Sequence, residues 1–142
     1  RSGVLRFWSA DTGASFTGVT PMVTVLVVAQ YMGFGMLVGW ARGRYEVHAP
    51  AVTGHPMFER LYRVHMNSLE QMVTLLPAMY LSAQFWSPLW SAAAGVAYIV
   101  GRFVYLKAYA NDPKSRTLGF VMGFFPVMGL LAATLVGAVM AG

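Results

Sequence analysis

The chain contains no cysteine among its 142 residues. This absence excludes a disulfide framework, a thiolate metal site and a cysteine nucleophile supplied by the protein itself. Charge is also scarce, because charged residues make up 11% of the chain, against about 25% in an average soluble domain. Hydrophobic residues make up 57%, so the composition indicates an integral membrane protein with one domain.

Acidic residues are scarcer than basic ones, which leaves a net charge of +5. Nucleic acid is not predicted as the partner of this surplus, because the chain has too little polar surface to form a basic groove. Orientation in a membrane explains the surplus better. No metal site is predicted either, since the ten methionines are best explained as apolar filler. Residues 1–18 lack the apolar core of a signal peptide and are predicted to form an N-terminal tail before a membrane domain over residues 19–142.

Two uncharged runs are long enough to be membrane helices on their own. They are Val19–Ala41 and Leu118–Gly142, and each exceeds the length needed for a hydrocarbon core of about 30 Å at 1.5 Å rise per residue. Pro126 is predicted to kink the second of these helices.

The middle uncharged stretch, residues 71–101, is too long for one span. It is divided at the Ser-Pro pair 87–88, where serine can cap a helix and proline suits its first turn. Each half then provides only about 22 Å of helix, which is shorter than the membrane. The second helix must therefore extend back over residues 63–70, and the third must continue to about Tyr109. The sequence thus predicts an all-α bundle of four transmembrane helices, two of which carry ionisable groups into the membrane.

Loop charges predict the orientation of this bundle. The first and third connections, with the adjoining helix ends, hold the basic residues Arg42, Arg44, Arg60, Lys107, Lys114 and Arg116. By the positive-inside rule this side is cytoplasmic, and both termini lie on the other side. In the third connection Asp112 is predicted to cap the fourth helix, with Pro113 as its first residue. The sequence does not choose between a bacterial inner membrane and the endoplasmic reticulum.

Polar residues of the predicted helices recur at helical spacing. Arg63, Asn67 and Glu70 are spaced i, i+4, i+7 and share one face of the second helix. A stripe on the third helix consists of Tyr98, Arg102, Tyr105 and Tyr109. Arg42 closes the first helix and Arg116 opens the fourth. All of these residues except Tyr98 are predicted to converge from four helices near the cytoplasmic side.

A positive pocket lined by tyrosines suits an anionic polar ligand, because arginine binds carboxylates through two parallel hydrogen bonds, and Glu70 could hold an ammonium group. The alternatives are that the charges only brace the bundle and that the tyrosines are interface anchors. His65 lies about 160° around the helix from this face, and a role behind the site, at a subunit contact or on the ligand stays open. His48 and His55 are predicted to be ordinary loop residues. A haem is not predicted, because only His65 is placed in a span.

Two stretches resemble one family. "FERLYRVHMNSLEQ" (residues 58–71) is similar to the helix-two signature E-R-x-x-R-x-[HQ]-x-N-x-x-E of the membrane-associated proteins in eicosanoid and glutathione metabolism, the MAPEG family. "GRFVYLKAYANDPKSR" (residues 101–116) resembles the end of helix three and the following loop of that family. The resemblance covers roughly residues 20–142.

The resemblance implies a homotrimer of four-helix chains, with glutathione as co-substrate bound between neighbouring chains at the cytoplasmic side. Carried over by motif, Arg116 would stabilise the glutathione thiolate and be the catalytic residue. The residues that would bind glutathione are Arg42, Arg63, Asn67, Glu70, Tyr105 and Tyr109. The roles of His65, Gln71, Arg102 and Thr117 stay open, either behind the site or at its edge.

Departures from the leukotriene-synthase branch are Gln71, where that branch has tyrosine, and Gly43, where it has a second arginine. His65 and Thr117 look more like the prostaglandin E synthase branch and bacterial members. The leading hypothesis is a transferase that conjugates glutathione to lipophilic electrophiles from the bilayer, or reduces lipid hydroperoxides with it. Alternatives are a non-catalytic lipid- or glutathione-binding member, a glutathione-dependent isomerase and a transporter.

Overall fold

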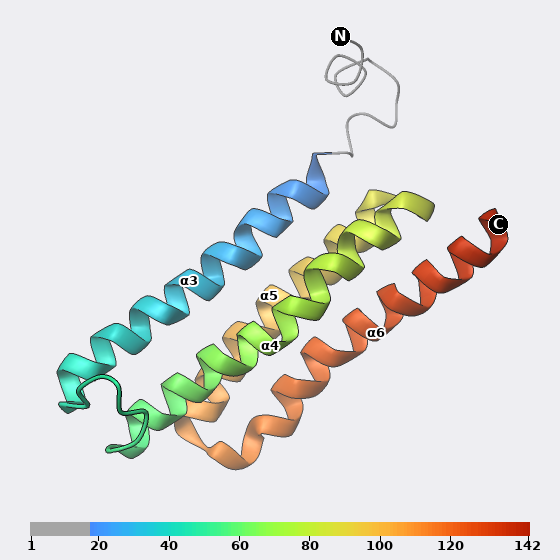
Figure 1. Ribbon diagram of the computed structural model, residues 1–142. Coiled ribbons are helices and arrows are strands. Elements are labelled where there is room, and N and C mark those ends of the chain that lie inside the picture. Colours follow the sequence, from blue (N-terminus) through green and yellow to red (C-terminus); the bar gives the residue numbers. More distant parts are fainter. Residues whose placement is uncertain (1–17) are drawn as a thin grey trace, which may run out of the picture.

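The computed structural model describes residues 18–142, and this part of the chain is a bundle of long helices. The elements are α3 (Val19–Tyr45), α4 (Pro56–Phe85), α5 (Pro88–Asn111), a 3-10 turn η1 (Pro113–Ser115) and α6 (Arg116–Ala141). Figure 1 shows the four long helices side by side, with successive helices running in opposite directions. The predicted tail over residues 1–18 lies outside the described residues except for Gly18.

The helix ends agree with the length argument. The predicted break at residues 87–88 is confirmed, because the Ser87 hydroxyl accepts a hydrogen bond from the backbone N–H of Leu89 (3.3 Å) and Pro88 is the first residue of α5. Helix α4 extends back beyond Arg63, and α5 continues to Asn111. Charged residues therefore lie within continuous helices, as the spans require.

The start of the fourth helix differs from the prediction. The Asp112 side chain caps a helix as expected, but the element it caps is η1, in which it accepts from the backbone N–H of Lys114 (3.0 Å). The next backbone bond, from Ser115 N–H to the Asp112 carbonyl (3.1 Å), has the i→i+3 pattern of a 3-10 turn, so α6 begins only at Arg116. Pro126 lies inside α6, which continues past it to Ala141, and the kink expected there stays a prediction.

Three stretches of the described chain are long and apolar enough to cross a membrane: Val19–Tyr45, Pro88–Asn111 and Pro113–Ala141. Helix α4 has 30 residues, but its N-terminal half carries the charged motif. It begins at the end of the bundle where α3 finishes and ends where α5 begins (Figure 1).

Helix α4 packs against each of the other three long helices, and the core lies along it. Apolar packing dominates the half away from η1, where Val27, Leu75 and Met79 are fully buried. Several polar side chains in the helix interfaces bond to backbone carbonyl groups, as a hydrocarbon environment favours. For example, the Gln30 amide donates to the carbonyl of Ile99 (2.8 Å).

Candidate functional site

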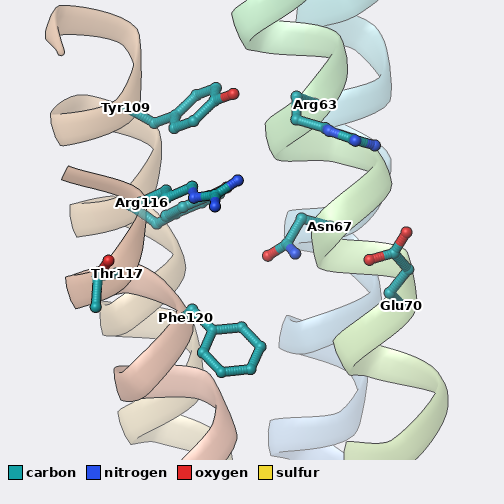
Figure 2. A pocket seen from close by; sticks show the side chains of 8 residues that line it. Arg63, Asn67, Glu70, Tyr109, Arg116, Thr117 and Phe120 are labelled. Atoms are coloured by element: carbon teal, nitrogen blue, oxygen red, sulfur yellow. The ribbon is translucent and has the colours of Figure 1, made fainter. Parts of the chain in front are cut away.

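A polar cavity of about 390 Å³ opens between α4, α5 and the start of α6 (Figure 2). It is lined by Arg63, Asn67, Glu70, Tyr105, Tyr109, Arg116, Thr117 and Phe120. Three separate helices thus contribute to a single cavity near the end of the bundle that carries η1 (Figure 1).

The α4 wall of the cavity is the predicted polar face. Arg63, Asn67 and Glu70 all line it, because their i, i+4, i+7 spacing places them on one side of the helix. Figure 2 shows Tyr109 and Arg116 directed toward this wall from the opposite elements. Two arginines therefore share the cavity with one carboxylate, which leaves it positively charged.

The opposite wall comes from α5 and α6. The rings of Tyr105 and Tyr109 stack with centroids 5.3 Å apart. Arg116, Thr117 and Phe120 occupy the first turns of α6. Sequence reasoning missed Phe120, although its position four residues after Arg116 on a helix would have placed it on the same face.

Two glycines of α6 make room for this wall. A Cβ atom at Gly119 would overlap Tyr105, and one at Gly123 would overlap the Gln71 side chain. The two glycines are four residues apart and therefore face the same side of α6. Tyr105 and Gln71 reach their observed positions only because α6 carries no side chain there.

Arg102 lies behind the cavity wall and is fully buried, with 0% of its surface exposed. Its Nη1 atom donates to the side-chain oxygens of Asn67 (2.7 Å) and Gln71 (3.0 Å), and its guanidinium lies 4.3 Å from the ring centroid of Tyr105. Its Nε and Nη2 atoms have no hydrogen-bond partner among the described residues. Of the residues with open roles, Thr117 therefore lines the cavity, whereas Gln71 and Arg102 support it from behind.

Arg42 does not line this cavity. Its Nη1 atom donates to the backbone carbonyls of Val47 (3.3 Å) and Ala51 (2.6 Å), and its guanidinium lies 4.8 Å from the ring centroid of Phe58. Within the single chain, α3 supplies no lining residue of this cavity among those described. The predicted contact of Arg42 with a ligand stays a prediction. Arg42 is instead held by the loop after α3, whose carbonyl groups need a donor.

His65 faces away from the cavity, as its position around the helix predicts. Its ring stacks on Tyr31 of α3 with centroids 4.5 Å apart, and its Nε2 atom lies 3.2 Å from the point where a Cβ of Gly35 would be. Among residues 18–142, no group of three or more His, Asp or Glu side chains is placed to hold a metal ion. What the described cavity offers a ligand is the pair of arginines on its wall, which suits anionic groups.

A family model described as "MAPEG family" matches residues 20–136 of this chain. The chain belongs to the MAPEG family. Human microsomal glutathione S-transferase 2 is 34% identical to this MAPEG protein over 117 residues, which cover 82% of this chain and 77% of the human one. An uncharacterized protein of Synechocystis sp. is 35% identical over 114 residues, covering 80% of this chain and 83% of its own.

Bovine leukotriene C4 synthase is also similar to this MAPEG protein, at 32% identity over 94 residues, which cover 66% of this chain and 63% of the bovine one. Both motifs that carried the resemblance, residues 58–71 and 101–116, lie within the matched range. The family assignment from these motifs is therefore confirmed. The similarity of His65 and Thr117 to the prostaglandin E synthase branch stays a prediction.

Proposed function

We propose that this MAPEG protein binds glutathione in the cavity between α4, α5 and α6 and transfers it to lipophilic electrophiles. The observation that supports this proposal is the set of charges on the cavity wall, two arginines and one glutamate next to two tyrosines. Glutathione has two carboxylates, one ammonium group and a thiol. Arg63 and Arg116 suit its anionic groups, and Glu70 suits its ammonium.

The reaction follows from a thiolate held in this positive cavity. Arg116 favours the charged form of the thiol, whose proton passes to solvent. The thiolate attacks an electrophilic carbon of an acceptor that enters from the bilayer, so that a C–S bond forms and the leaving group, chloride in the case of a chlorodinitrobenzene, departs as an anion. With a lipid hydroperoxide as the acceptor, two glutathione molecules give the alcohol, water and glutathione disulfide. Relatives named glutathione S-transferase and leukotriene C4 synthase support a reaction of this class.

A homotrimer is part of the proposal. Arg42 lies outside the cavity of its own chain, so its predicted contact with a glutathione carboxylate requires a ligand at the boundary with a neighbouring copy. The binding residues proposed within one chain are Arg63, Asn67, Glu70, Tyr105 and Tyr109.

Binding and turnover of the purified protein test the proposed function. Wild type is expected to bind glutathione by calorimetry and to conjugate it to a chlorodinitrobenzene. Glu70→Gln is expected to bind glutathione about tenfold or more weakly, because a neutral amide replaces the carboxylate that faces the ammonium. Binding without turnover of either electrophile or lipid hydroperoxide would indicate a carrier. If Glu70→Gln keeps its affinity for glutathione but no longer assembles into the oligomer, Glu70 braces the helices instead of binding the ligand.

We also propose that α4 crosses the membrane, with the η1 end of the bundle in the cytoplasm. Because α3 and α5 are apolar spans and α4 connects opposite ends of the bundle, α4 has to cross as well. Variants with one cysteine, Ser115→Cys or Ala141→Cys, can be labelled selectively because the chain has no cysteine. Position 115 is expected to react only from the cytoplasmic side and position 141 only from the other side. The reverse pattern would invert the orientation and the access to the cavity.

A further inference from the structure

The hydrogen bond between Arg102 and Asn67 limits how the Asn67 amide can be oriented. A guanidinium has only donors, so the atom that it contacts at 2.7 Å has to be the Asn67 oxygen and not its nitrogen. Gln71 is constrained in the same way, with its oxygen 3.0 Å from the same Nη1 atom. Arg102 is fully buried, so water does not compete for these contacts.

Asn67 also lines the cavity, between Arg63 and Glu70 on the α4 wall (Figure 2). With its oxygen held by Arg102, the group that it has free for a ligand is the amide NH₂. We infer that Arg102 is a positioning residue that fixes Asn67 as a hydrogen-bond donor, so that the ligand group bound there is an acceptor, a carboxylate or carbonyl oxygen.

This orientation of the Asn67 amide gives the α4 wall two kinds of binding position, one for a cationic group and one for an anionic group. A glutamate one turn away is an acceptor and suits a cationic group, whereas Asn67 and Arg63 are donors and suit an anionic one. Adjacent positions on the wall therefore select opposite ends of a zwitterionic ligand. The identity of that ligand as glutathione rests on the proposed function, but the orientation of the amide does not.

A bracing role alone does not account for the arrangement. A buried arginine that only held helices together would be expected to pair with a carboxylate, and its remaining N–H groups would find acceptors. Here its hydrogen bonds go to two neutral amides, and Nε and Nη2 are unpartnered among residues 18–142. Because Arg102 pairs with a neutral amide, residue 67 keeps an N–H donor for its cavity side. A carboxylate at position 67 would have no such donor.

The variant Asn67→Asp separates positioning from bracing, because the two properties are expected to move in opposite directions. The carboxylate pairs with Arg102, so the melting temperature of the detergent-purified protein is expected to stay the same or rise. The donor that faces the ligand is lost, so glutathione affinity measured by calorimetry is expected to fall at least tenfold. Arg102→Met is also expected to weaken binding about tenfold, because the Asn67 amide is then free to turn.

Tyr98→Phe provides a matched control, since Tyr98 donates to the Ser68 carbonyl (2.9 Å) beside Arg102 but does not line the cavity. It is expected to bind glutathione like wild type. Asn67→Asp with affinity equal to or above wild type would overturn the inference, as would Arg102→Met with unchanged affinity.

A stability measurement separates this inference from the proposed function. Asn67→Asp is expected to lower the melting temperature in the Arg102→Met background, where the buried carboxylate has no partner, and not in the wild-type background. Additive changes would overturn the inference whatever the ligand is. Failure of wild type to bind glutathione, with this coupling intact, would overturn the proposed function alone.

Discussion

Replacing Arg116 with alanine is expected to remove the thiolate absorption of bound glutathione and to lower the conjugation rate at least 100-fold. Loss of one preorganised electrostatic group at a reacting centre costs about 10²–10³ in rate. Bound thiolate absorbs at about 240 nm whereas the thiol does not, so absorption reports the protonation state of the bound sulfur. Glutathione binding is expected to remain measurable, because Arg63, Asn67 and Glu70 stay in place.

The position of Arg116 supports a functional role. It is the first residue of α6, where the partial positive charge of the helix N-terminus opposes a cation by about 0.3–1 kcal/mol. The first turn of α6 contains no acidic residue to offset this cost. An anion in the cavity would interact favourably with both the guanidinium and the helix terminus. Each unit by which they lower the pKa of the thiol corresponds to about 1.4 kcal/mol of preference for the thiolate.

Lys114→Ala is the matched control for Arg116→Ala. Lys114 is another exposed cation of the same connection, but it does not line the cavity. In this variant the 240 nm band and the conjugation rate are expected to stay within about twofold of their wild-type values, since an exposed charge is largely screened. If Arg116→Ala keeps both the band and the rate, Arg116 only interacts with lipid headgroups, and Tyr105 or Thr117 becomes the candidate partner of the thiol.

The helices could be predicted from the sequence because membrane thickness and capping residues limit where they begin and end. The length argument required α4 and α5 to include charged residues, and Ser87 marked the break between them. The polar face of α4 followed from helical spacing alone. The start of α6 was misplaced, because the same Asp-Pro pair can begin a 3-10 turn or an α-helix. Helix α4 also begins earlier than the length argument required, at Pro56, and α3 continues past Ala41 to Tyr45.

The deeper arrangement of the site could not be predicted, because it depends on how helices rotate against one another. Arg102, Tyr105 and Tyr109 form one stripe in the sequence, yet Arg102 is buried behind the wall while the two tyrosines line the cavity. Arg42 is at the predicted end of the bundle, but carbonyl groups of an irregular loop hold it away from the cavity. Loop conformation is not specified by a periodic pattern, so no spacing rule could have indicated this contact.

Gly119→Ala is expected to destabilise the protein by about 1–3 kcal/mol and to lower glutathione affinity more than tenfold, through overpacking against the cavity wall. The added methyl group would overlap Tyr105 from its Cβ to its ring. Rotation of the ring cannot relieve a collision with Cβ, so α5 and α6 have to separate. Thermal unfolding and calorimetric binding of glutathione measure the two effects.

Gly129→Ala in the same helix is the matched control, because a Cβ there meets nothing within 4 Å. Alanine is favoured over glycine in a helix interior by about 1 kcal/mol, and this gain is common to both variants. Gly129→Ala is therefore expected to be as stable as wild type or more stable, with unchanged binding. Equal behaviour of the two variants would mean that α6 does not pack on Tyr105 through Gly119. A loss confined to Gly119→Ala would instead show that this close approach of α6 to α5 holds Tyr105 against the ligand.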